Sequence, residues 1–276
     1  MTEKEQFARN LEALVSELAE HVSTGNGQWT IKGFIDVFKN VYTISSDTKI
    51  ISKILEIHLL PKILEFAQTN GYRVVLAAHQ NYYPDISFVK ASDESIKFAV
   101  DFKTTYRIPE KPHLCNGFTL GSHGEYFENR ASTKNIQFPY GSYSGHFCLG
   151  IIYDRTDGAS IDETKAHSIS DLQSITSVAG NFQFFVTEKW KIASDKGGSG
   201  NTANIGSINN IDDIINGRGM FSRLGEKWFD EYWMNYKKIT IKDGKGGTKK
   251  ISSLREFVEY KNGDLTLLVK KRGGKL

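Results

Sequence analysis

Residues 96–104 restrict the possible folds of this chain more than any other stretch. Apolar side chains occupy every second position and alternate with charged, small or polar ones, in the order Ile96, Lys97, Phe98, Ala99, Val100, Asp101, Phe102, Lys103 and Thr104. Because successive side chains of a β-strand point to opposite faces, this pattern predicts a strand with one apolar, core-facing side. Asp101 and Lys103 then share the other face.

A shorter strand is predicted just upstream, over residues 85–90, and it begins with Asp85. The link between the two strands, residues 92–95, has the composition of a turn. A loop of three or five residues would place Asp85 directly opposite Asp101. A loop of four residues would put the two side chains on opposite faces unless a bulge intervenes. The sequence leaves both registers open.

Asp85 and Asp101 are candidate metal ligands, and Lys103 is a candidate catalytic residue. Two neighbouring carboxylates repel each other unless a cation lies between them, and an oxygen-only ligand set suits Mg²⁺. A lysine beside such an ion can polarise an attacking water or stabilise the charge that develops on a phosphate. The pattern of Pro-Asp followed by Asp-x-Lys therefore favours Mg²⁺-assisted phosphodiester hydrolysis, although an isolated Asp-x-Lys on a strand is more often a solvated surface.

Length and composition bound the class of protein. The chain has 276 residues, of which 39% are hydrophobic, enough for a single domain with a sizeable core over residues 1–276. No run is apolar enough to span a membrane, and the charged N-terminal residues lack the apolar core of a signal peptide. The two cysteines, Cys115 and Cys148, provide no disulfide framework. These features predict a cytoplasmic protein.

The net charge of +3 conceals an uneven distribution along the chain. Residues 237–276 contain twelve Lys and Arg against four Asp and Glu, so this end carries +8 and the remainder carries −5. A basic end on an acidic body is compatible with a polyanionic partner, and equally with a solubilising tail.

Helices and further strands are predicted around the central strand pair. Apolar spacing predicts a helix over residues 3–22 and a second helix that begins at residue 46 or 47 and ends at residues 70–71. Pro61 is expected to kink this second helix or to end its first half. Glu56 falls on its polar face, where a glutamate is most often simply solvated. The remaining expectations are a strand pair in residues 28–44, strands over 72–77, 146–153 and 182–192, a loop over 108–132, and an aromatic helix over 221–236.

Residues 194–207, SDKGGSGNTANIGS, are rich in glycine and asparagine. The glycines permit close approach to another surface, and asparagine can pair with adenine in the major groove of DNA. The segment lacks the Gly-Lys-Ser/Thr ending of a phosphate-binding loop. On composition alone, a flexible hairpin tip is the better interpretation.

Several separate stretches together resemble the EcoRV family of type II restriction endonucleases, within the PD-(D/E)xK nuclease superfamily. The resemblance covers roughly residues 5–237 and is most specific in the glycine-rich run. The matching stretches are SDTK (46–49), QNYYPD (80–85), DFKTTY (101–106), FTLG (118–121), TKNI (133–136), GSGNTANIGSI (198–208) and GRGMF (217–221).

The resemblance implies an α/β (mixed α+β) fold, in which a twisted mixed β-sheet is flanked by helices and a small subdomain in residues 28–44 serves dimerisation. It implies a catalytic and DNA-recognition core over residues 45–237. The basic C-terminal extension that follows, over residues 238–276, is longer than in the family and departs from its pattern. The family assembles as a symmetric homodimer that grips double-stranded DNA, and each subunit cuts one strand.

The resemblance also assigns roles to single residues. Asp85 and Asp101 would hold Mg²⁺, and Lys103 would assist the attacking water. Glu56 takes the place of an acidic residue linked to metal binding or positioning. The implied DNA-binding residues are Gly198, Ser199, Gly200, Asn201, Thr202 and Asn204 in the major groove, Gln80 and Asn81 on the minor-groove side, and Lys134 near the backbone.

The family reads the palindrome GATATC and cuts it at the centre to leave blunt ends, so the same site is expected here. The chain departs from the family pattern at Ala203, which replaces a threonine, at His79, which replaces a glutamine, and after Gly121, where the loop is two residues longer. These departures concern flanking-sequence preference and specificity more than the type of reaction.

Two other functions stay open. A repair or recombination nuclease of the same superfamily would read DNA structure instead of sequence, and the intact base-reading run argues against it. A catalytically silent DNA-binding module would be free to lose part of the set Asp85, Asp101 and Lys103, which is complete.

Overall fold

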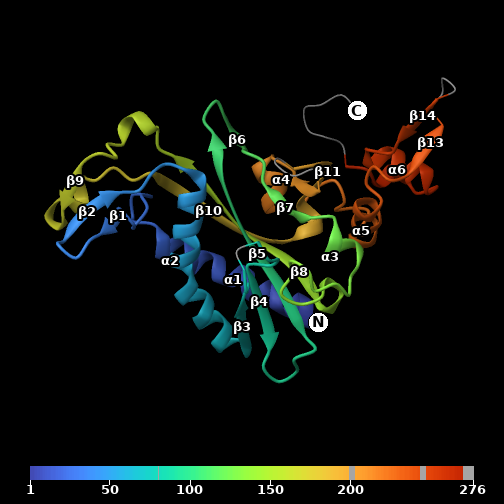
Figure 1. The fold of residues 1–276 in the computed structure, drawn as a ribbon, viewed down its shortest axis with the longest axis horizontal. Helices are drawn as coiled ribbons and strands as arrows, with labels where there is room; N and C mark the ends of the chain where they lie inside the picture. The colour runs from blue at the N-terminus through green and yellow to red at the C-terminus, as the bar shows by residue number, and fades with distance from the viewer. Residues whose placement is uncertain (80, 199–202, 243–246, 270–276) are drawn as a thin grey trace.

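The centre of the molecule is a six-stranded mixed β-sheet (Figure 1). The computed structural model describes residues 1–79, 81–198, 203–242 and 247–269. The strand order is β10-β8-β5-β4-β3, and β6 pairs with the C-terminal end of β5. β5 and β8 run parallel, whereas the other neighbouring strands run antiparallel. The strands are β3 (Tyr72–Leu76), β4 (Ile86–Lys90), β5 (Lys97–Ile108), β6 (Lys111–Cys115), β8 (Gly145–Arg155) and β10 (Ala179–Glu188).

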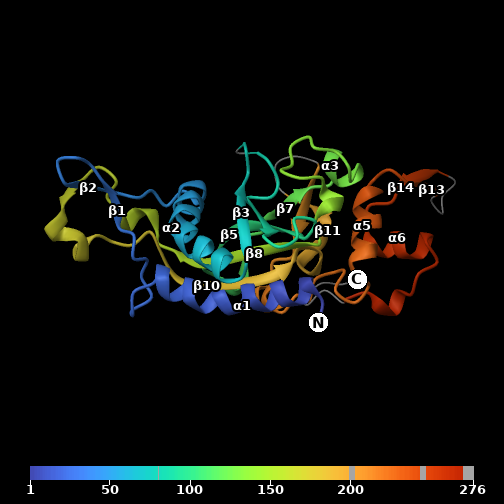
Figure 2. The same ribbon diagram turned by 90° about the horizontal axis from the view of Figure 1, so that it is seen from below.

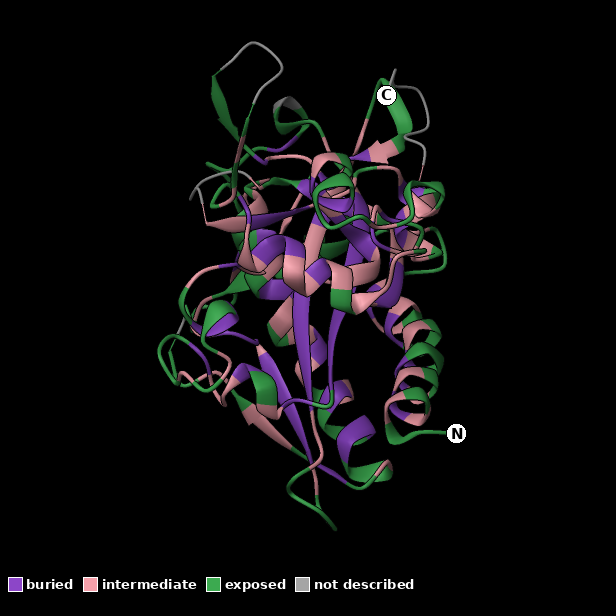
Figure 3. Ribbon diagram, turned by 90° about the vertical axis from the view of Figure 1, so that its right-hand side faces the viewer, coloured by how far each residue is buried: buried purple, intermediate pink, exposed green. Residues whose placement is uncertain are grey.

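Both faces of this sheet are covered, and its strands form the buried middle of the molecule (Figure 3). On β5, Phe98, Val100 and Phe102 enter a first core on one face. Ala99 enters a second core on the opposite face, where Asp101 is buried as well. The predicted alternation is confirmed, but the face that carries Asp101 is not a solvated surface.

The first core lies between the sheet and two long helices, α1 (Glu3–Val22) and α2 (Thr48–Thr69). α1 runs along β10 (Figure 2), and α2 packs against α1, β3 and β5. Each helix begins at a residue that caps it: Thr2 and Glu5 form a capping box on α1, and the Asp47 carboxylate accepts two backbone N–H groups of α2.

α2 continues through Pro61 as one helix, so the expectation that this proline would end the first half is wrong. Proline removes one backbone donor from the helix. The side chains on either side of it, Leu59 and Ile63, are fully buried in the first core. Their burial holds both halves of the helix against the sheet.

The second core lies under a smaller sheet of order β11-β12-β7 and several short helices. The predicted loop over residues 108–132 is wrong, because this stretch contains the end of β5, all of β6 and β7, and α3. Its glycines and prolines mark the turns between short strands. The elements on this side are β7 (Thr119–Ser122), α3 (Glu125–Glu128), β11 (Ala193–Gly197), β12 (Asn204–Ser207), α4 (Ile211–Ile215) and α5 (Glu226–Met234).

The described part of the C-terminal extension is a folded unit and not a tail. It contains β13 (Thr240–Lys242), β14 (Thr248–Lys250) and α6 (Leu254–Tyr260). Leu254 and Phe257 are buried in the second core. The short 3₁₀ helices of the molecule are η1 (Tyr140–Ser142), η2 (Gly158–Ser160), η3 (Ile169–Ser174), η4 (Lys189–Ile192) and η5 (Leu265–Leu267).

A third sheet projects at the end of the molecule farthest from α6 (Figure 1). It consists of β1 (Gly33–Ile35), β2 (Asn40–Thr43) and β9 (Ala166–Ser168), which confirms the strand pair expected in residues 28–44. Within the part of the chain that the structure describes, no helix combines the length and apolar character needed to cross a bilayer.

Candidate active site and DNA-reading hairpin

The two aspartates of the central strand pair face each other. β4 pairs with β5 in a register that, extended by one position, places Asp85 opposite Asp101. The turn accounts for this register, because the N–H of Lys90 donates to the C=O of Ile96 (3.0 Å) and leaves five residues, 91–95, in the loop. The structure therefore adopts the five-residue alternative, which puts both carboxylates on one face.

Backbone and side-chain contacts hold the pair in place. The N–H of Phe102 donates to Oδ2 of Asp85 at 2.7 Å. The N–H of Asp85 lies 3.4 Å from Oδ1 of Asp101, and Nζ of Lys103 lies 2.5 Å from Oδ2 of Asp101. The three residues predicted from the spacing thus form one contiguous cluster.

The charges in this cluster do not balance. Burial raises the pKa of Asp85, and the neighbouring Asp101 carboxylate raises it further. Burial also disfavours ionisation of Asp101, but the Lys103 ammonium outweighs it and lowers the pKa of Asp101. For Lys103, burial disfavours the charged form, yet the two carboxylates prevail and raise the pKa of its ammonium. Lys103 thus favours the charged form of Asp101, while burial and the neighbouring carboxylate favour the protonated form of Asp85.

The donor chemistry fits a hard divalent cation. Asp85 and Asp101 supply carboxylate oxygens, and a cation bound there would replace the proton that burial and charge repulsion place on Asp85. Among the described residues, no group of three or more His, Cys, Asp and Glu side chains forms a metal cluster. The other ligands would be waters and phosphate oxygens, as Mg²⁺ prefers.

Glu56 lies on the wall of a pocket of about 870 Å³ that Asp85 also lines. Its carboxylate pairs with Nζ of Lys53 at 2.8 Å. Lys49, Lys53 and Ser52 line the same pocket from α2, so the polar face that the sequence suggested to be merely solvated opens onto the candidate active site. The sequence placed these residues beside Glu56 but gave no reason to assign them a role.

An aromatic stack supports the segment that carries Asp85. The ring of Tyr83, two residues before Asp85, stacks on Tyr126, Tyr140 and His146. Its hydroxyl lies 3.0 Å from Nδ1 of His146. The Nζ of Lys189 lies 4.8 Å from the centroid of the Tyr83 ring. The sequence singled out none of these supporting residues, because they come together only through the fold.

The glycine-rich run forms a hairpin on the second core. β11 and β12 pair antiparallel, and β12 also pairs with β7. Among the predicted base-reading residues, Gly198 and Asn204 lie at the base of the turn, where the N–H of Gly198 donates to the C=O of Asn204 at 2.9 Å. Ser199, Gly200, Asn201 and Thr202 lie outside the described residues, as does Gln80.

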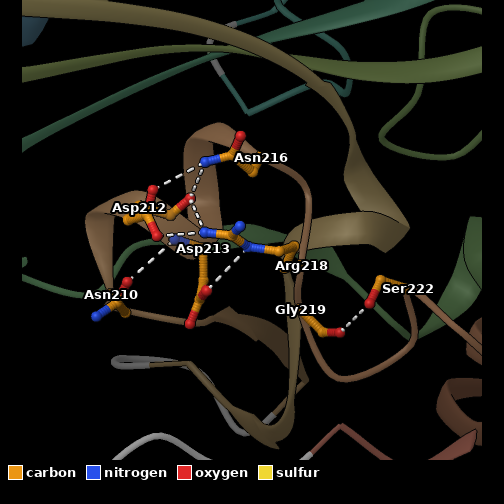
Figure 4. Close-up of polar contacts among 7 residues, drawn as sticks. All are labelled: Asn210, Asp212, Asp213, Asn216, Arg218, Gly219 and Ser222. Atoms are coloured by element: carbon orange, nitrogen blue, oxygen red, sulfur yellow. Dashed lines mark hydrogen bonds and ion pairs between the residues drawn. The ribbon is translucent and has the colours of Figure 1, made fainter.

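The base of the hairpin is held by the segment that follows it. Arg218 binds the carboxylates of Asp212 and Asp213 at the start of α4 (Figure 4). The next residue, Gly219, donates its N–H to the C=O of Lys191 at 2.7 Å, just before β11. A Cβ at Gly219 would lie 2.5 Å from that oxygen, so only glycine fits this close approach.

Asn81 and Lys134 belong to two segments that pair with each other. Tyr83 bridges to Ile136, and its N–H donates to the C=O of Asn135 at 3.1 Å. Both Asn81 and Lys134 are exposed, and Nζ of Lys134 lies 3.4 Å from Glu125 of α3. The fold thus places these two predicted DNA contacts beside the segment that leads into Asp85.

Comparison with known proteins gives two matches. The family described as Restriction endonuclease EcoRV matches residues 25–262 of this chain. The type II restriction enzyme EcoRV of Escherichia coli is 35% identical over 229 residues, an alignment that covers 83% of this chain and 91% of that protein. The family match extends past residue 237 into the C-terminal unit, farther than the motifs alone indicated.

Proposed function

Because this chain belongs to the EcoRV family of restriction endonucleases and is a type II site-specific deoxyribonuclease, we propose that it requires Mg²⁺ and cleaves duplex DNA at GATATC. The cut falls at the centre of the site and leaves blunt ends with 5′-phosphates. The observation that carries this proposal is the facing pair of Asp101, which is buried, and Asp85, which is partly buried, with Lys103 in contact with Asp101.

Three residues would perform the chemistry. Asp85 and Asp101 would hold the cation, which when bound supplies positive charge to the phosphate under attack. Lys103, fixed by its contact with Asp101, would orient the attacking water and stabilise the charge that develops on the phosphate. Glu56, on the wall of the adjoining pocket, would help to position the metal-binding site.

Recognition would come from the β11–β12 hairpin. Gly198, Ser199, Gly200, Asn201, Thr202 and Asn204 are the proposed major-groove contacts. Gln80 and Asn81 would contact the minor-groove side, and Lys134 the backbone. Phosphate contacts set the position of a protein on DNA, whereas contacts to base edges read its sequence. Replacement of Asn201 by alanine should therefore weaken discrimination by about 1–3 kcal/mol for each base that the amide side chain would read.

A palindromic site fits a two-fold symmetric dimer, and we propose that residues 28–44 form its interface. Several large apolar side chains of this segment are exposed in the single chain: Phe34, Ile35, Val37, Phe38 and Tyr42. Exposed apolar side chains gathered in one place mark surfaces that another protein covers. A cytoplasmic location fits the two cysteines, which are unpaired and buried.

The proposal is tested by digestion of a plasmid that carries one GATATC site, with and without Mg²⁺, followed by sequencing of the ends. Blunt cuts at the site centre that require Mg²⁺ are expected. Cuts at another fixed sequence would retain the catalytic residues and overturn the recognition site. Cuts at branched or distorted DNA without sequence preference would favour a repair or recombination nuclease. No cleavage by well-folded protein would favour a DNA-binding module.

A further inference from the structure

Helix α5 packs against α6 of the C-terminal unit, and both are bonded directly to the strand that leads into the base-reading turn. α5 lies beside β11, and α6 lies next to α5 (Figures 1 and 2). The hydroxyl of Tyr232 donates to the C=O of Asp195 at 2.7 Å. The N–H of Leu254, at the start of α6, lies 3.3 Å from Oδ2 of Asp195, and Nζ of Lys196 donates to the C=O of Ser252 at 3.0 Å.

An irregularity in β11 makes the backbone C=O of Asp195 available for the bond from Tyr232. Ala193 pairs with Ser207 and Gly197 pairs with Ile205, so residues 194–196 of β11 lie opposite Gly206 alone. In a bulge of this kind, the extra residues are released from the ladder to the neighbouring strand. Here the backbone C=O of Asp195 accepts from the Tyr232 hydroxyl instead. The contacts with Leu254 and Ser252 are made by the side chains of Asp195 and Lys196. The irregular part of β11 is therefore the place where the C-terminal elements contact the hairpin.

Burial makes the contact rigid. Asp195 and Tyr232 are both buried, and the ring of Tyr232 packs against Trp233 and Phe257 of the second core. A buried carbonyl that loses its donor stays unsatisfied, because water cannot replace it without opening the packing. The position of β11 is thus tied to the position of α5 and α6.

We propose that the C-terminal unit is a brace that determines sequence specificity, with Asp195 as the positioning residue and Tyr232 as its partner. The inference rests on the proposed role of the hairpin in reading bases. Asp195 precedes the first predicted base contact, Gly198, by three residues, so a shift at Asp195 reaches the turn directly. The brace acts on recognition and not on the chemical step, because Asp85 and Asp101 lie on a different sheet.

The test compares Tyr232→Phe, which removes one hydroxyl, with Tyr236→Phe as the matched control. Tyr236 packs on Tyr232 with ring centroids 5.6 Å apart, but no hydrogen bond joins it to the described residues of the hairpin. The readout is the ratio of kcat/KM on the preferred site to that on a site with one base pair changed. Tyr232→Phe is expected to lower this ratio about tenfold through KM, with kcat retained. Tyr236→Phe is expected to leave it within about twofold.

A second pair of variants separates positioning from general support. Asp195→Asn keeps a side-chain oxygen to accept the N–H of Leu254, so it should retain discrimination. Asp195→Ala removes that oxygen and should abolish discrimination. An unchanged ratio in both Tyr232→Phe and Asp195→Ala, even with a lower Tm, would overturn the brace.

Hydrogen exchange in DNA-free protein tests the contact between β11 and the C-terminal unit without relying on DNA recognition. Lys196→Met removes the bond to Ser252 at an exposed position, so the amides of residues 193–197 should exchange faster than in the wild type. Unchanged exchange would contradict the brace even if the other variants failed to fold. Cleavage by the wild type without sequence preference would overturn the recognition role of the hairpin, and the exchange result would still stand.

Discussion

At the scale of single residues, the proposed active-site cluster of Asp85, Asp101 and Lys103 contains two carboxylates and one ammonium held close together by the fold. The buried carboxylate of Asp101 lies with the partly buried Asp85 carboxylate and Lys103 ammonium, and the hydrogen bond from Phe102 fixes Asp85 beside Asp101. Burying a charge without compensation is costly, so the excess negative charge of this cluster has to be balanced by a bound cation or a proton. Strand periodicity predicted that Asp101 and Lys103 share one face, and the five-residue turn, which the sequence left open, brings Asp85 to the same face.

Lys189 is a residue that the sequence could not predict. It is only 2% exposed, and its Nζ has no hydrogen-bond partner among the described residues. The rings of Tyr83, Phe127 and Tyr140 surround it at 4.8–5.3 Å. Burial lowers the pKa of this ammonium to about 8. Nothing in the local sequence, Glu-Lys-Trp, distinguishes it from a surface lysine, because the rings come from three distant segments.

Lys189→Met is expected to stabilise the protein at pH 7 by about 1–3 kcal/mol, because it removes the cost of a buried charge. The folded-state pKa of Lys189 lies below that of the unfolded chain. The cost is therefore fully present below pH 8 and disappears as the pH rises toward the unfolded pKa of about 10.5. Urea unfolding of both proteins at pH 7 and pH 9.5 measures the difference.

The solvent-exposed Lys227→Met is the control, because it removes the same charge from α5 without altering a buried group. Equal free energies of unfolding of Lys189→Met and wild type at pH 7 would show that the aromatic rings compensate the buried charge in full. A difference in the free energy of unfolding that grows as the pH rises would contradict the predicted pH dependence.

At the scale of the elements, packing decides what the sequence pattern leaves open. Periodicity predicted α1, β5 and β8, whose apolar patterns are long and regular. It failed over residues 108–132, where strands of four or five residues are too short to show a period. At Pro61, the alternative in which the proline ends the first half of the helix was wrong, because tertiary burial overrides the local preference. The five-residue turn between β4 and β5 was one of two open choices, and the bonding of Lys90 to Ile96 selects it.

Gly150 of β8 gives a direct test of this packing. A Cβ at this position would lie 1.9 Å from the ring of Phe185 on the neighbouring strand β10. Gly150→Ala should therefore destabilise the fold by about 1–3 kcal/mol or more, because the ring has to leave its place in the second core. Urea denaturation measures the loss. A Cβ at Gly25 would have no neighbouring heavy atom within 4 Å, so Gly25→Ala should leave the urea midpoint nearly unchanged. An equal loss of stability in both variants would contradict the tight packing of Gly150 against Phe185.

At the scale of the whole molecule, the two ends have different surfaces. The sheet of β1, β2 and β9 exposes apolar side chains, with Val37 at 90% and Phe38 at 82% exposure. The other end carries the folded C-terminal unit (Figure 1). The sequence could predict the strand pair at the first end, but not the packing of the second, because the interactions of residues 238–269 with the hairpin are all long-range.

We expect the protein to sediment as a dimer and Phe38→Glu to shift it toward the monomer, since a charge in an apolar interface loses its solvation without a partner. Sedimentation velocity at several concentrations measures the change. Tyr260→Glu, an equally drastic change at a half-exposed position on α6, should leave the dimer intact. A wild type that remains monomeric at all concentrations would contradict the assigned interface.

Asp101→Asn removes one charge from the proposed active site and preserves the size of the side chain, so its cleavage rate tests the proposed metal-binding centre directly. On a plasmid with one GATATC site and saturating Mg²⁺, cleavage by Asp101→Asn should fall below detection, while circular dichroism and Tm stay close to those of the wild type. Wild-type cleavage rates in a folded Asp101→Asn variant would contradict the assignment of Asp85, Asp101 and Lys103 as the hydrolytic centre.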